Sequence, residues 1–211
     1  MSREDFSVTI GGHDLEYIDE EHIYLVDGLL VPSITEIVRS AEPDKYKSVD
    51  PDVLARAAEK GTAVHKAIEE YVTEGFESDL PELRGFKFLQ RHYRFKPVRA
   101  EVPVILFRRC RKNSTDEPVA AGRLDLVLEN TEGSLGLADI KRTSALDKNY
   151  LAYQLNLYRL AYEQTYGGQI DFLAGLHLRE DVRKYVPIPL VPQMAGELID
   201  KYFNVLEGKN E

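Results

Sequence analysis

Two apolar segments, each carrying one carboxylate, constrain this chain most strongly. Ala121–Leu128 contains Asp125, and Leu137–Lys141 contains Asp139, followed two residues later by Lys141. Side chains alternate between the faces of a β-strand, so Asp139 and Lys141 share a face. Buried charges need partners, two adjacent carboxylates repel each other, and a divalent cation is the usual remedy. The pattern therefore favours metal-assisted phosphodiester hydrolysis, with Lys141 facing the phosphate.

An Asp-x-Lys tripeptide alone is common, and a surface hairpin with a charged pair explains it equally well. Two neighbouring helical segments favour the catalytic interpretation. Upstream, one apolar stripe with helical spacing contains a histidine and consists of Val53, Leu54, Ala57, Gly61, Val64, His65, Ile68 and Tyr71. Downstream, Gln154 and Tyr158 lie one turn apart on the same face of a second helix.

Five segments taken together resemble a known family. They are Gly-Thr-Ala-Val-His-Lys-Ala-Ile-Glu-Glu-Tyr-Val (61–72), Ala-Glu-Val-Pro-Val-Ile-Leu (100–106), Ala-Gly-Arg-Leu-Asp-Leu-Val-Leu-Glu (121–129), Ala-Asp-Ile-Lys-Arg (138–142) and Tyr-Gln-Leu-Asn-Leu-Tyr (153–158). Their order and spacing resemble the PD-(D/E)XK nuclease superfamily, in particular its RecB-like and phage-type exonuclease branch. The segment from His22 to Thr35 is also similar to the entry segment of phage-type and mitochondrial genome maintenance exonucleases.

The resemblance implies an α/β fold with a restriction-endonuclease-like core, in which helices flank a mixed central sheet. It also implies a metal centre for Mg²⁺ or Mn²⁺ formed by His65, Asp125, Asp139 and the backbone carbonyl of Ile140. The implied catalytic residues are Asp125, Asp139, Lys141 and Glu101, and the implied DNA-binding residues are Gln154, Tyr158, Arg108, Arg109, Arg123 and Arg142.

Two of these residues keep alternative interpretations. A histidine on an apolar helix stripe is often a core residue, so His65 is either a metal ligand or part of the core. Strand alternation puts Arg99, Glu101 and Ile105 on one face, so Glu101 either takes part in catalysis or only pairs with an arginine.

The charge distribution is uneven. The chain has a net charge of −9, yet residues 84–112 contain ten basic residues and one acid, a local charge of +9 that leaves −18 for the rest. This basic stripe predicts phosphate binding, with a solvated helix face and a charged turn as the alternative.

Composition limits the cofactors. Cys110 is the only cysteine, so the four ligands of an iron–sulphur cluster are lacking, and no Gly-x-x-x-x-Gly-Lys-[Ser/Thr] loop indicates ATP binding. We find no long uncharged apolar run and no leader-like N-terminus, and therefore expect a protein that contacts no membrane and works in the cytoplasm.

The 211 residues predict one nuclease domain, whose entry segment, a hairpin and a helix, covers about residues 1–48. After it we expect helices from Asp50-Pro51 and over 81–93, then strands over 98–107, 119–129 and 134–141, with a loop over 112–118. A helix over 146–166, strands over 170–178 and 183–189 and a helix over 192–206 complete the chain.

The sequence therefore predicts a magnesium- or manganese-dependent exonuclease that degrades linear DNA from free ends, as in phage-type recombination and repair. A structure-specific endonuclease and a non-cleaving nucleic-acid-binding protein on the same fold are the alternatives. Without an ATP motor, directional digestion fits a ring homo-oligomer that encloses its substrate. A single-strand annealing or single-strand-binding protein is the expected partner.

Overall fold

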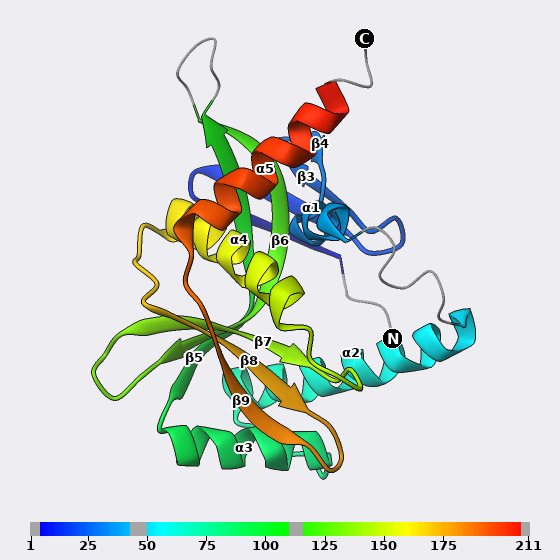
Figure 1. Ribbon diagram of the computed structural model, residues 1–211, viewed down its shortest axis with the longest axis vertical. Coiled ribbons are helices and arrows are strands. Elements are labelled where there is room, and N and C mark those ends of the chain that lie inside the picture. The colour runs from blue at the N-terminus through cyan, green and yellow to red at the C-terminus, as the bar shows by residue number, and fades with distance from the viewer. Residues whose placement is uncertain (1–4, 43–49, 110–115, 208–211) are drawn as a thin grey trace.

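The computed structural model describes residues 5–42, 50–109 and 116–207 (Figure 1). Arg111, Lys112 and most of the predicted loop at 112–118 lie outside these ranges. The elements are, in chain order, β1 (Phe6–Ile10), β2 (His13–Ile18), β3 (Ile23–Val26), β4 (Leu29–Val31), α1 (Ile34–Ala41), α2 (Pro51–Glu74), α3 (Pro81–Tyr93), β5 (Lys96–Arg109), β6 (Asp116–Glu129), β7 (Leu135–Lys141), α4 (Lys148–Tyr166), β8 (Phe172–Leu178), β9 (Arg183–Ile188) and α5 (Pro192–Glu207).

The central sheet has the strand order β5-β6-β7-β8-β9. Strands β7 and β8 run parallel, and the other neighbouring pairs run antiparallel. Helix α4 connects the two parallel strands, as a crossover between parallel strands requires. The predicted fold class, an α/β fold with a mixed sheet between helices, is confirmed.

Helices cover both faces of this sheet (Figure 1). One face packs against α1, α4 and α5 through a cluster that includes Ile34, Val104, Val127, Leu155 and Leu198. The other face packs against α2 and α3 through a second cluster that includes Val64, Ile68, Phe86, Leu126 and Ile140. Neighbouring residues of a strand therefore point to opposite faces of the sheet, so that Leu126 faces α2 while Val127 faces α4.

The entry segment forms a sheet of its own, with the antiparallel order β1-β2-β3-β4. Its apolar face packs against Ile105 and Ala121 of the long strands β5 and β6. The Ala121 amide also donates a hydrogen bond to the Pro32 carbonyl, at 3.1 Å. Strand β1 was not predicted from the sequence, although the alternating Phe6, Val8 and Ile10 before two glycines are typical of a hairpin strand.

Several helices begin at the residues that the sequence indicated. The Ser33 hydroxyl accepts a hydrogen bond from the Glu36 amide at 3.0 Å, and the Asp50 carboxylate accepts one from the Asp52 amide at 2.8 Å. Pro81 occupies the first turn of α3. At Ser33 and Asp50 the side chain thus accepts from an amide that has no acceptor inside the helix, and at Pro81 the proline has no amide that would need one.

The prediction of one buried stripe along the whole of α2 is wrong for its first half. Val53 is 50% exposed and Ala57 is exposed, whereas Val64 and Ile68 are buried. Figure 1 shows the first turns of α2 extending beyond the sheet, so they have no surface to pack against. In the described ranges, no helix is both long enough and apolar enough to span a membrane.

Candidate metal centre

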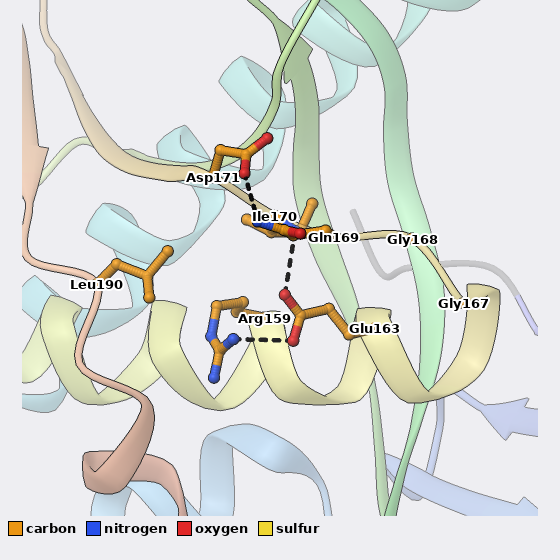
Figure 2. Close-up of a pocket in the computed structure, with 8 residues that line it drawn as sticks. All are labelled: Arg159, Glu163, Gly167, Gly168, Gln169, Ile170, Asp171 and Leu190. Carbon is orange, nitrogen blue, oxygen red and sulfur yellow. Dashed lines mark hydrogen bonds and ion pairs between the residues drawn. The ribbon is translucent and has the colours of Figure 1, made fainter.

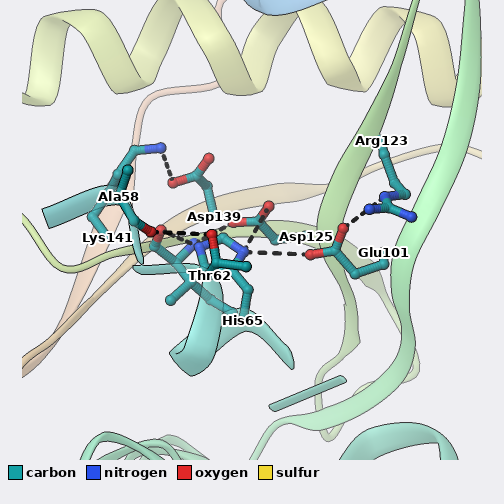
Figure 3. A network of polar contacts seen from close by, with 9 residues as sticks. Ala58, Thr62, His65, Glu101, Arg123, Asp125, Asp139 and Lys141 are labelled. Carbon is teal, nitrogen blue, oxygen red and sulfur yellow. Dashed lines mark hydrogen bonds and ion pairs between the residues drawn. The ribbon is translucent and has the colours of Figure 1, made fainter. Parts of the chain in front are cut away.

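His65 is the hub of a polar cluster between α2 and the sheet (Figure 3). Its neighbour Val64 packs into the core, which turns the imidazole toward the strands. His65 Nδ1 lies 3.3 Å from Glu101 Oε1 and 3.5 Å from Asp125 Oδ1, and His65 Nε2 lies 3.2 Å from the Ile140 carbonyl oxygen. Helix α2 thus places one imidazole in contact with residues of three strands, β5, β6 and β7.

Asp125 is held in place by the neighbouring strand. Its Oδ2 accepts a 2.7 Å hydrogen bond from the Ile140 amide, which leaves Oδ1 directed toward His65. On the same strand as Ile140, the Lys141 ammonium lies 2.7 Å from Asp139 Oδ2. The prediction that Asp139 and Lys141 share a face is confirmed.

Glu101 reaches the cluster because its backbone breaks the strand pattern. Its φ of 47° lies in the left-handed region, which costs a non-glycine residue about 1–3 kcal/mol. The prediction that Arg99, Glu101 and Ile105 share one face is therefore wrong. Arg99 lies over the Tyr166 ring and Ile105 packs under the entry sheet, while Glu101 turns toward His65.

The geometry is compatible with both predicted roles of Glu101. Its Oε1 faces His65, and its Oε2 lies 2.8 Å from Arg123 Nε, as Figure 3 shows. Arg123 directly precedes the Leu124-Asp125 pair on β6. The arginine thus orients one carboxylate oxygen and leaves the other directed into the cluster.

The cluster balances three acids against three basic groups, and this balance shifts the ionisation of its members. Burial alone would lower the pKa of His65, but Asp125, Glu101 and Asp139 raise it to about 9. Burial, together with the neighbouring acids and against the pull of His65, raises the pKa of Asp125 to about 6. Burial would lower the pKa of Lys141, but Asp139 and Asp125 raise it.

These donors fit a divalent cation. Ligand atoms of His65, Glu101 and Asp125 all lie within 4.8 Å of one another, and the Ile140 carbonyl oxygen lies 3.2 Å from His65 Nε2. Oxygen ligands suit Mg²⁺ and Mn²⁺, and an imidazole is better tolerated by Mn²⁺. The geometry thus adds Glu101 to the predicted ligands, while Asp139 lies outside this group and pairs with Lys141.

A cavity of about 720 Å³ opens beside the cluster along α2. Its lining includes His65, Glu101, Arg123 and Lys141, and also Gly61, where an added Cβ would meet no atom within 4 Å. The same cavity is also lined by two cations that were not predicted as site residues, Arg39 and Lys66. Lys66 follows His65 directly in sequence, whereas no local pattern marks Arg39.

The predicted DNA-binding residues are spread over the molecule. Arg123 belongs to the cluster, Arg109 is exposed at the end of β5, Arg142 pairs with Glu82 and Glu180, and Arg108 pairs with Asp200. Gln154 and Tyr158 are buried on the α4 side. A Cβ at Gly122 would come within 3.0 Å of the Tyr158 ring, so Tyr158 packs against the strand that carries Asp125.

A second hollow, of about 510 Å³, lies at the end of α4 (Figure 2). Glu163 accepts a hydrogen bond from the Ile170 amide at 3.0 Å and pairs with Arg159 at 2.8 Å. Gln169 donates to Asp171 at 2.8 Å. These contacts attach the α4–β8 connection to the helix, which is a structural role.

Comparison with known proteins adds little to this geometry. Neither a family model nor a curated protein matches the chain. Among solved structures, the crystal structure of SSO0001 is similar, with a TM-score of 0.46 and 16% identity over 83% of this chain and 76% of that chain. A likeness of this size carries no argument about function.

Proposed function

We propose that this protein is a divalent-metal-dependent deoxyribonuclease that digests DNA from free ends. The observation that carries the proposal is the convergence of His65, Glu101 and Asp125 at the edge of a cavity, with the Ile140 carbonyl oxygen 3.2 Å from His65 Nε2 and the Asp139–Lys141 pair beside them. Acids and a histidine around one point, with a lysine next to them, are the groups that phosphodiester hydrolysis requires.

His65, Glu101, Asp125 and the Ile140 carbonyl would hold Mg²⁺ or Mn²⁺. When bound, such an ion polarises the phosphate and lowers the pKa of water. Asp139 holds the Lys141 ammonium at the cavity, where it offsets negative charge developing on the phosphate. Arg123 keeps Glu101 aligned. The single cysteine is compatible with work in the reducing cytoplasm.

The preference for ends rests on the sequence resemblance of the entry segment and on the lack of an ATP-binding loop. A strand fed from its terminus to Asp125 and Asp139 needs no motor if each hydrolysis step advances it. Closed circular DNA offers no terminus. Progressive shortening of linear DNA, with closed circles intact, is therefore the expected result.

The test incubates purified protein with end-labelled linear, nicked and closed circular DNA, with EDTA, Mg²⁺ or Mn²⁺. Asp125→Asn should abolish cleavage, and Asp14→Asn, an exposed aspartate of the entry sheet, should preserve it. Efficient nicking of closed circles would replace the exonuclease with an endonuclease. The absence of any cleavage with either metal would leave a nucleic-acid-binding protein.

The ligand set has its own test. Glu101→Gln and His65→Ala should each raise the metal concentration needed for half-maximal cleavage, because each removes one ligand. If His65 served only the core, His65→Ala would instead lower the melting temperature and leave the metal requirement unchanged.

A further inference from the structure

Aromatic rings lie exposed along α3 and the adjoining strand β9. Phe88 is 38% and Tyr93 48% exposed, although large apolar side chains are usually buried. The Phe88 and His92 rings are 5.7 Å apart and within 9° of parallel, and Tyr93 stacks on Tyr185 at 4.5 Å and 22°. The rings hold one another in place, so a flat ligand would not need to order them.

The same surface carries exposed positive charge. Arg91, Arg94 and Lys96 follow one another along α3 and the start of β5, and Arg183 begins β9; all four are exposed. In the ranges that the structure describes, none of the four pairs with a carboxylate. Among the acids nearby, Glu77 pairs with Lys87 and Glu180 with Arg142. Negative charge remains at Glu129 opposite Lys96, at Asp171 near Tyr93 and Tyr185, and at Asp181 in the β8–β9 turn.

Cations and rings are combined at one point. The Arg183 guanidinium lies 4.4 Å over the Phe88 ring, where it faces the negative face of the π system. Tyr93 and Tyr185 also border a hollow of about 370 Å³ whose lining includes Phe95 and Phe172. The surface therefore offers flat apolar faces with positive charge around them. It is called the α3–β9 strip below.

The α3–β9 strip adjoins the metal centre without sharing a residue with it. Ile140 lies opposite Leu176, and Leu176 lies opposite Tyr185. Tyr185 is therefore two strands away from Ile140, about 10 Å across the sheet. Strand β9 is the outer strand of the sheet, and α3 lies beside it (Figure 1).

We propose that the α3–β9 strip binds single-stranded nucleic acid, with bases stacked on Phe88 and Tyr93 and phosphates near the free cations. Single-strand-binding surfaces combine these two components, aromatic platforms and a positive track along the backbone. An acidic protein partner would use the cations but would not require near-parallel exposed rings. Binding at the strip needs neither a metal ion nor cleavage, so it goes beyond the nuclease function.

The experiment measures fluorescence anisotropy of a labelled oligothymidylate of about 15 nucleotides in EDTA, which prevents cleavage. Replacing both rings by Phe88→Ala and Tyr93→Ala should weaken binding by about tenfold or more, since each stacked base contributes through a ring. Phe76→Ala is the matched control, because Phe76 is a phenylalanine 61% exposed outside the strip. Phe88→Tyr with Tyr93→Phe keeps both rings and should keep the affinity.

The cations are tested by salt. Arg91→Gln with Arg183→Gln should flatten the plot of log affinity against log salt by about 0.7 for each lost phosphate contact. Melting curves of every variant establish that the fold is intact. Unchanged binding by the double alanine variant, or equal losses for Phe76→Ala, would overturn the proposal. If the oligonucleotide fails to bind and a labelled polyglutamate binds, the strip is assigned to an acidic protein instead.

Discussion

The core beside α4, called the α4 side below, and the polar cluster around His65 treat buried polar groups in opposite ways. On the α4 side, the Asn156 side chain donates to the carbonyls of Ala152 and Pro189 and accepts from the Val191 amide. The Thr165 hydroxyl accepts from the Ile105 amide and lies within donating distance of the Ala161 and Ile105 carbonyls. In the cluster around His65, charged side chains pair mainly with each other.

This contrast separates stability from chemistry. A backbone partner is fixed by the fold and does not titrate, so the α4 side keeps its hydrogen bonds at any pH or metal concentration. Side chains that pair with one another can exchange a proton for a metal ion. We therefore expect changes in the cluster around His65 to alter catalysis and changes on the α4 side to alter the free energy of unfolding.

The largest expected effect is in the cluster around His65. Lys141→Ala should lower the cleavage rate by about 10²–10³-fold, because one charge facing the reacting phosphate is lost. Single-turnover digestion of linear DNA measures the rate, and a thermal melt checks the fold. Lys148→Ala, at the exposed start of α4, is the control. A rate above roughly a hundredth of wild type would contradict the role.

The second prediction concerns a substitution on the α4 side that should lower stability and leave cleavage unchanged. Asn156→Ala should lower the free energy of unfolding by about 2–4 kcal/mol, because the Val191 amide and Pro189 carbonyl lose their partner. Urea denaturation measures the loss, and exposed Asn149→Ala should stay within about 0.5 kcal/mol. Cleavage per folded molecule should not change. A fall in cleavage per folded molecule would contradict the contrast between the α4 side and the cluster around His65.

The pH dependence of metal-free protein sharpens the comparison. Because the folded-state pKa of His65 is raised from 6.5 to about 9, its contribution to stability is present below pH 6.5 and is lost as pH rises through 9. Metal-free protein should therefore lose up to about 3 kcal/mol over this window. Added Mn²⁺ should stabilise more as pH rises, because the ion replaces the His65 proton.

Urea denaturation at a series of pH values, with EDTA or Mn²⁺, tests this expectation. His65→Gln should remove the downward slope of the metal-free protein, and Asn156→Ala should shift the curve without changing its slope. A metal-free stability that is flat between pH 6.5 and 9 would show that His65 carries no charge in the folded cluster.

The smallest effect concerns the cavity. Gly61→Ala should raise helix stability by about 1 kcal/mol, since the new Cβ meets no atom. It should nevertheless weaken DNA cleavage, because the methyl group narrows the cavity beside His65. Gly196→Ala in α5 also has free space and should stabilise equally without loss of activity. Equal activity of both variants would mean that DNA does not approach Gly61.

Local signals explain most of what the sequence predicted. Ser33, Asp50-Pro51 and Pro81 each begin a helix because capping depends on a few adjacent residues. The ends of α4 and of β6 follow from Gly167 and from the turn after Glu129. The first turns of α2 were misjudged because periodicity shows which residues share a face, not whether a surface exists to cover it.

The sequence by itself determined the two strands that carry Asp125 and Asp139 and the common face of Asp139 and Lys141, because a two-residue period is a property of the chain. Only the tertiary structure decided that Glu101 joins His65 and Asp125, because one positive φ reverses the direction of a side chain and no local pattern announces it. It also decided that Arg142 pairs with Glu82 while Arg123 pairs with Glu101. Partners distant in sequence are set by packing, which the sequence pattern does not encode locally.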